Sequence, residues 1–102
     1  YNLFLDDDRQ PIMCRMFDGD GSPYETEKWE IVRSYDDFYH CIKNLGIPKL
    51  VSFDYQLNRE KDGLDCARLL KFFCDDENKP IPEYYVHSSW TGIYGKFKEI
   101  LG

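Results

Sequence analysis

The stretch that decides the fold is LVSFDYQL, residues 50–57, where an apolar run ends directly in an acid. The run up to Phe53 has the composition of a strand that packs in a core. Asp54 follows it at once, although a turn at this place could use Gly or Asn. The beginning of the chain repeats the arrangement, because NLFL at residues 2–5 runs directly into Asp6. Two apolar strands that both end in carboxylates suggest that these acids have a chemical task.

Hydrophobic patterning predicts four strands and three helices. The strands are expected at residues 2–5, 29–34 and 49–53, and from residue 84 onward in YYVHSS. Each helix follows a residue that can cap its first turn, and these residues are Ser34, Asp62 and Thr91. Ser34 and Asp62 also have an acid three residues later, which is the spacing of a capping box.

Residues 8–27 lack periodicity and are rich in Asp, Gly and Pro, so we expect a long polar loop there. Its acids begin at Asp18 with the spacing that starts an EF-hand loop. However, Pro23 stands where that loop needs Gly, and Trp29 stands where it needs a bidentate acid. We therefore expect no calcium site in this segment.

The order strand, loop, strand, helix, strand, helix, strand, helix predicts an α/β fold with an open, mainly parallel, four-stranded sheet flanked by helices. Residues 1–102 are expected to form a single domain. The formal net charge of −6, from 19 acids and 13 bases, argues against an extended nucleic-acid surface. No apolar run approaches a membrane span, and the four cysteines form no C-x-x-C pair. Reduced thiols in a cytoplasmic protein are the simplest interpretation.

In open parallel sheets, ligands bind beyond the carboxyl ends of the strands. Here three of the four strand ends carry polar, reactive side chains. Asp6, Asp7, Asp8 and Arg9 follow the first strand, Asp54, Tyr55 and Gln56 the third, and His87, Ser88 and Ser89 the fourth. Strand-end chemistry is thus the main functional signal in the sequence.

If the first and third strands are neighbours, Asp6 or Asp7 converges with Asp54. Clustered carboxylates repel each other unless a proton or a cation neutralises them. Oxygen ligands suit Mg²⁺ or Mn²⁺, so we expect one of these ions as cofactor. The alternative is that these acids merely cap loops and helices.

Three further residues are candidates for phosphate chemistry. His87 can act as a general acid or base, or it can be a structural imidazole. Arg9 can hold a phosphate with its guanidinium fork, or it can be a solvated surface residue. Ser88 offers a hydroxyl to a phosphate oxygen.

The motifs LFLDDD, VSFDYQL and DGLDCARLL, with a hydroxyl after the fourth strand, resemble the receiver domains of two-component response regulators. The resemblance implies that Asp6 and Asp7 bind Mg²⁺, that Asp54 accepts phosphate and that Ser88 contacts the phosphoryl group. It also implies that the backbone carbonyl of Gln56 is a metal ligand. This chain differs by having a loop in place of the first helix and no room for a fifth strand with its Lys.

A narrower group is more similar: the receiver-like domains predicted to process cyclic phosphates in bacterial and phage RNA-repair and conflict contexts. The matching residues are Asp6, Asp7, Arg9, Pro11, Asp54, Leu57, His87 and Ser88. The chain departs from that pattern at Gln56, where a second acid is usual, and at Ser89-Trp90, where an Asn often follows.

The resemblance implies a metal-dependent phosphoesterase that acts on a 2′,3′-cyclic RNA end or a cyclic nucleotide, with Asp54 and His87 catalytic. Asp54 would be either a metal ligand or the nucleophile. The alternatives are a phosphoacceptor switch and a non-catalytic module that binds a nucleotide or a partner protein. The last helix and the sheet edge are candidate surfaces for such a partner or for a homo-oligomer.

Overall fold

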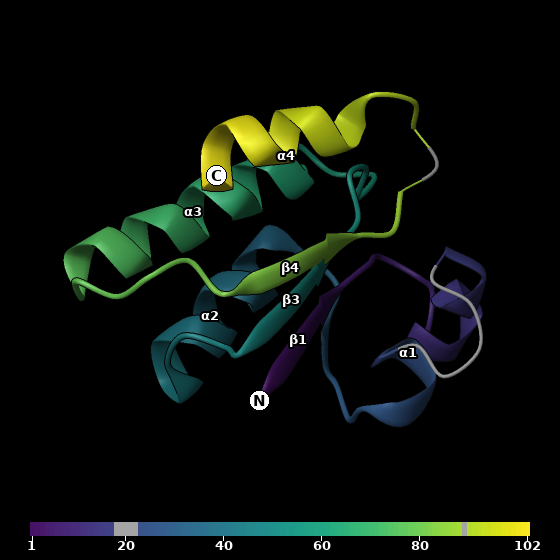
Figure 1. The fold of residues 1–102 in the computed structure, drawn as a ribbon, viewed down its shortest axis with the longest axis horizontal. Coiled ribbons are helices and arrows are strands. Elements are labelled where there is room, and N and C mark those ends of the chain that lie inside the picture. The colour runs from purple at the N-terminus through teal and green to yellow at the C-terminus, as the bar shows by residue number, and fades with distance from the viewer. Residues whose placement is uncertain (18–22, 89) are drawn as a thin grey trace.

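A computed structural model describes residues 1–17, 23–88 and 90–102 of the chain (Figure 1). Its strands are β1 (Asn2–Leu5), β2 (Glu30–Val32), β3 (Leu50–Phe53) and β4 (Glu83–Val86). Its α-helices are α1 (Pro23–Thr26), α2 (Tyr35–Leu45), α3 (Gly63–Asp76) and α4 (Ile93–Leu101), and Pro11–Phe17 forms a 3₁₀ helix, η1. After β4 the described residues form α4 and no further strand, as the sequence predicts.

The four strands form one sheet in the order β2-β1-β3-β4, and every pair is parallel. β1 therefore lies beside β3, the condition under which Asp6 and Asp54 meet. In the register, Leu5 stands opposite Phe53, and Phe53 stands opposite Val86. This confirms the predicted α/β class and the open four-stranded parallel sheet.

The main hydrophobic core covers one face of the sheet. Leu5 and Phe53 point into it together with apolar residues of α2, α3 and α4. Figure 1 shows α3 and α4 side by side along this layer. Phe53 contacts Phe38 of α2 and Phe97 of α4, with ring centroids 5.9 and 5.1 Å apart. Helices α2 and α4 thus pack on the same central aromatic side chain.

The opposite face of the sheet packs against η1 and α1, and this corrects the prediction for residues 8–27. That segment was expected to be a loop, but its described parts contain two short helices. A second cluster forms there from Phe4, Cys14 and Tyr24, all buried. The helices carry no sequence periodicity because each is too short for a repeating apolar face, and contact with the sheet stabilises them instead. The spacing that begins at Asp18 lies outside the described residues.

Two of the three predicted N-cap residues are confirmed. Ser34 accepts a hydrogen bond from the backbone N–H of Asp37, and Asp62 forms a reciprocal capping box with Asp65. The third prediction is wrong, since Gly92 and not Thr91 is the N-cap of α4. Gly92 has a φ of 79°, a left-handed conformation that favours glycine, so the backbone turns at Gly92 and no side chain caps α4.

None of the helices in the described part of the chain combines the length and apolarity needed to cross a membrane. All four cysteines are free thiols, with Cys14, Cys66 and Cys74 buried and Cys41 partly buried. Burial raises the pKa of the Cys14 thiol to about 11, so the thiol is protonated near neutral pH.

Candidate functional site

The residues that follow β1, β3 and β4 form one row at the carboxyl edge of the sheet. Their backbone N–H groups continue the parallel ladder one step beyond the strands. Asp6 donates to Val32 O at 3.1 Å, Asp54 to Leu5 O at 3.0 Å, and His87 to Phe53 O at 2.9 Å. The backbone of the sheet itself therefore fixes these three residues relative to one another.

Asp6 is completely buried, and its carboxylate accepts four hydrogen bonds. Oδ1 accepts the backbone N–H groups of Asp8 and Arg9 at 3.0 and 2.9 Å. Oδ2 accepts Arg9 Nε at 2.7 Å and His87 Nε2 at 3.0 Å. The usual acceptor positions of the carboxylate are thus filled by groups of the chain itself.

Asp6 and Asp54 have opposite electrostatic environments. Burial opposes ionisation of Asp6, but the hydrogen bonds from His87, Arg9 and Asp8 hold its pKa well below the ordinary value. Burial, together with the negative charge of Asp6, raises the pKa of Asp54 to about 6, although Arg9 opposes this rise. Asp6 is a permanent anion at neutral pH, whereas Asp54 titrates within the range in which acid–base catalysts operate.

Arg9 connects the two acids. Its Nε binds Asp6, and its Nη2 lies 3.3 Å from Asp54 Oδ1. Its guanidinium remains partly exposed, so it lies at the surface of the site. The prediction that Asp6 and Asp54 converge is therefore confirmed in geometry, with a guanidinium between them.

A hollow of about 270 Å³ opens in front of Arg9 and Asp54. Its lining consists of Asp7, Asp8, Arg9, Asp54, Gln56, Asn58, Ser88 and Trp90. Five of the expected site residues meet there: Asp7, Arg9, Asp54, Gln56 and Ser88. Asp6 and His87 do not line the hollow, because both lie behind Arg9 with no exposed surface.

His87 is held from both sides. Its Nε2 contacts Asp6, and its Nδ1 lies 2.6 Å from Ser52 Oγ. Its ring stacks on Phe4 with centroids 4.6 Å apart and planes 4° apart. Burial lowers the pKa of His87 against the opposing effect of Asp6, so the imidazole is neutral near pH 7. The structure places this histidine as a buried partner of Asp6 and not at the hollow.

Sequence reasoning missed several residues that shape the site. Arg33, after β2, donates from Nη1 to the backbone carbonyls of Asp6 and Arg9 at 3.1 and 2.6 Å. Asn58 donates from Nδ2 to Asp7 Oδ2 at 2.6 Å. The sequence could have indicated Ser52, because it is a polar residue in an otherwise apolar strand and strand alternation places it on the same face as Asp54. The sequence gives no indication of the roles of Arg33 and Asn58, since their hydrogen-bond partners lie 24 or more positions away.

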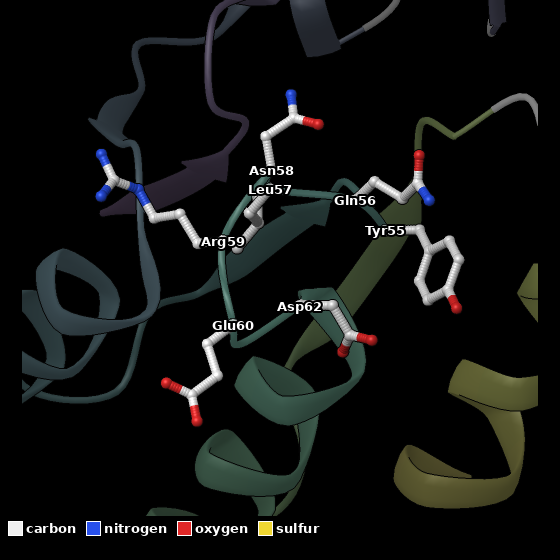
Figure 2. A pocket seen from close by; sticks show the side chains of 7 residues that line it. All are labelled: Tyr55, Gln56, Leu57, Asn58, Arg59, Glu60 and Asp62. Carbon is white, nitrogen blue, oxygen red and sulfur yellow. The ribbon is translucent and has the colours of Figure 1, made fainter.

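The loop after β3 brings Gln56 and Asn58 into place. Figure 2 shows Asn58 projecting from the middle of this loop, on the side opposite to Glu60 and Asp62. Asn58 has a φ of 53°, and its amide binds Asp7 as described above. The same loop lines a second hollow of about 300 Å³ that shares Gln56 and Asn58 with the first. The loop therefore forms one wall of the site.

The donors at the first hollow fit a hard divalent cation. Carboxylates of Asp7, Asp8 and Asp54 line it, together with the amide side chains of Gln56 and Asn58. Mg²⁺ and Mn²⁺ prefer such oxygen donors. Among the described residues, ligand atoms within 4.8 Å of one another occur in two groups, Asp6-Asp7-Asp8 and Asp6-Cys14-His87. Both groups contain Asp6, whose oxygens are already filled by Arg9, His87 and two backbone N–H groups, and the Cys14 thiol of the second group is protonated, so neither group as a whole suits the ion.

The family described as "Cyclic-phosphate processing Receiver domain" matches residues 1–99 of the chain. No curated protein and no solved structure gives a match. The match covers the whole sheet and the whole row of strand-end residues, and it confirms the resemblance read from the motifs around Asp6, Asp54 and His87. This chain belongs to the cyclic-phosphate processing receiver domain family.

Proposed function

We propose that this domain is a metal-dependent phosphoesterase that opens a cyclic phosphate carried by a nucleoside, either at a 2′,3′-cyclic RNA end or in a cyclic nucleotide. One observation carries the proposal. A cation, Arg9, and a hydroxyl residue, Ser88, share a polar hollow with Asp54, a carboxyl group whose pKa is raised to about 6. Phosphate-binding groups and a titratable acid are groups that phosphoester hydrolysis uses.

Asp7, Asp54 and the backbone carbonyl of Gln56 would hold Mg²⁺ or Mn²⁺. The bound ion would polarise the phosphate and lower the pKa of a water molecule. Asp6 has a different role in this proposal, because its oxygens are already filled by Arg9, His87 and two backbone N–H groups. It anchors Arg9 from behind, as a fixed negative charge.

Arg9 and Ser88 would hold the non-bridging phosphate oxygens, which gain charge in the transition state. A water oxygen forms a new bond to phosphorus, and the bond from phosphorus to one ribose oxygen breaks. The water proton passes to Asp54, and the released ribose oxygen takes a proton from solvent. The product is a phosphomonoester. His87 acts here through Asp6, since it does not reach the hollow.

Trp90 supports a nucleoside as the carrier of the phosphate. It lines the hollow with 54% of its surface exposed. One edge contact, to Tyr55 at 5.6 Å and 77°, steadies the indole, and its backbone N–H donates to Ser88 Oγ at 3.3 Å. An exposed indole beside a phosphate site is a stacking platform for a base.

The test is a turnover assay with Mg²⁺ or Mn²⁺ on a panel of 2′,3′-cyclic and 3′,5′-cyclic nucleotides, with glycerol 1,2-cyclic phosphate as the base-free substrate. We expect the wild type to open a nucleoside cyclic phosphate and EDTA to stop the reaction. Asp54→Asn should lower kcat/KM by roughly a hundredfold or more, because it removes both a ligand and a proton acceptor. Asp76→Asn, at the exposed end of α3, is the matched control.

Trp90→Ala should raise KM for the nucleotides by roughly five- to a hundredfold, the range of base–aromatic stacking, and leave the base-free substrate unaffected. Tyr94→Ala, an equally exposed aromatic on α4, is its control. If no metal supports turnover and calorimetry detects no metal binding, the proposal that this domain is a metal-dependent enzyme is refuted. A stable aspartyl-phosphate on Asp54 after treatment with acetyl phosphate would instead identify a phosphoacceptor switch.

A further inference from the structure

A continuous chain of buried side chains runs from α1 to the candidate site. Tyr24 Oη lies 2.6 Å from Ser52 Oγ, and Ser52 Oγ lies 2.6 Å from His87 Nδ1. The imidazole then contacts Asp6, which holds Arg9. Tyr24, Ser52, His87 and Asp6 are all buried, so water does not compete for these hydrogen bonds. The chain joins four segments that are far apart in the sequence: α1, β3 and the residues that follow β4 and β1.

The Asp6 end of the chain decides which way the protons point. Asp6 is an anion and only accepts, so His87 Nε2 must carry a proton and donate to it. A neutral imidazole then has a bare Nδ1, which accepts from the hydroxyl of Ser52. The oxygen of Ser52 is left to accept from Tyr24. Every donor thus points toward Asp6, and one arrangement satisfies all four groups.

We propose that Ser52 and Tyr24 are positioning residues: they hold the imidazole of His87 with Nε2–H directed at Asp6, and so fix Arg9 between Asp6 and Asp54. This inference rests on the proposed function for the use made of Arg9, but the positioning itself is independent of turnover. It gives α1 a specific task. The short helix α1 supplies the hydroxyl that begins the chain.

Packing alone does not explain the choice of residues. Ser52 lies in the buried centre of β3, between Val51 and Phe53, where an apolar side chain would stabilise the strand more. A serine there is stable only when its hydroxyl is satisfied, and it is satisfied by His87 and Tyr24. The stacking of the imidazole on Phe4 fixes the plane of the ring, but it leaves open which nitrogen carries the proton. Asp6 makes that choice by accepting from Nε2, and the hydroxyl of Ser52 stabilises it by donating to the bare Nδ1.

The direct test is ¹⁵N NMR of the protein labelled in histidine, recorded at pH 8 on the full chain without metal. The chain has two histidines, and His40→Gln assigns the spectrum. We expect His87 to show a protonated Nε2 and an unprotonated, hydrogen-bonded Nδ1. In Ser52→Ala, the Nδ1 resonance should move to the position of a nitrogen without a donor. In Tyr24→Phe, which keeps the ring, a smaller shift in the same direction is expected.

Kinetics on the best nucleotide substrate supply the second readout. Ser52→Ala should lower kcat roughly tenfold, less than the roughly hundredfold that the loss of a whole transition-state donor costs, because Arg9 is displaced and not removed. Ser52→Thr should restore both the activity and the ¹⁵N shift, and Tyr94→Phe should change neither. Should the wild type carry its proton on Nδ1, or should both variants keep the wild-type shifts, the proposal is overturned. If the ¹⁵N shifts of His87 change as expected but the protein shows no turnover, the positioning role of Ser52 and Tyr24 is supported and the phosphoesterase proposal is refuted.

Discussion

At the scale of the residue, the two acids that look alike in the sequence differ most in the structure. Asp6 and Asp54 each follow an apolar strand, and that pattern correctly placed both at one edge of the sheet. The pattern does not distinguish the roles of the two acids, because their pKa values differ through the hydrogen-bond donors that surround each carboxylate. Asp6 receives His87 from 81 positions away, whereas Asp54 has a lone guanidinium contact from Arg9 and its own neighbour's N–H. Contacts over such a distance depend on the fold, so a motif alone does not reveal them.

The raised pKa of Asp54 predicts a stability cost that grows with pH. Its folded-state pKa of about 6 lies above the ordinary value of 3.8, so the folded protein binds this proton more tightly than the unfolded chain. Stability from this group is therefore present at low pH and is lost as pH rises from about 4 to 6. Asp54→Asn removes this loss. Relative to the wild type, the variant should gain about 1 to 3 kcal/mol in unfolding free energy between pH 4 and pH 7, measured by urea titration.

Mg²⁺ provides the complementary measurement. If Asp54 holds a cation, Mg²⁺ should raise the melting temperature of the wild type at pH 7 and not that of Asp54→Asn. Asp76→Asn, an exposed acid in the last turn of α3, should follow the wild type in both experiments. If the difference in unfolding free energy between wild type and Asp54→Asn stays constant across the pH range, the pKa of Asp54 is not raised in the folded protein.

At the scale of the element, the start of α3 is built against the end of β3. Gly63 donates its N–H to Tyr55 O at 2.6 Å, and a Cβ at this position would lie 1.8 Å from Asp54 O. The contacting atom belongs to the backbone, which has little freedom to move. The Asp-Gly pair of DGLD therefore has two purposes: Asp62 caps the helix, and Gly63 lets the helix approach the strand end that carries Asp54.

Gly63→Ala should displace the backbone at Asp54 and destabilise the protein by about 1 to 3 kcal/mol, with loss of whatever activity depends on Asp54. Gly95→Ala is the matched control, because a Cβ at Gly95 meets nothing within 4 Å and α4 gains a better helix former. We expect its melting temperature to equal or exceed that of the wild type. Equal behaviour of the two variants in thermal unfolding would contradict the tight contact.

The sequence predicted some elements better than others, and the reason is physical. The strands and the helices α2 and α3 carry their own signals, such as the capping box of Asp62 and Asp65. The helices η1 and α1 carry none, because Cys14 and Tyr24 are held by packing around Phe4 and His87 and not by a local repeat. The start of α4 was misplaced at Thr91 for a similar reason, since a backbone turn at Gly92 leaves no side-chain signal.

At the scale of the whole molecule, the sheet has unlike faces. Three helices bury one face in an apolar core, and the η1–α1 segment covers the other with aromatic and polar groups. The buried polar chain from Tyr24 to Asp6 lies on this second face. The core face thus supplies stability, while the second face supplies the alignment of the site. The chain as a whole is acidic, with a formal net charge of −6.

This charge predicts how the proposed enzyme should treat RNA of different lengths. Each added phosphate increases the repulsion between the substrate and an acidic protein, whereas a basic groove would reward length. For oligonucleotides with the same 2′,3′-cyclic end, kcat/KM at 20 mM salt should therefore be highest for the mononucleotide and fall as the chain lengthens. Raising the salt to about 0.15 M shortens the Debye length to about 8 Å and should narrow the difference. A kcat/KM that instead rises with RNA length at low salt, and falls when salt is added, would reveal an extended cationic track and contradict a domain that recognises only the phosphate and its adjoining base.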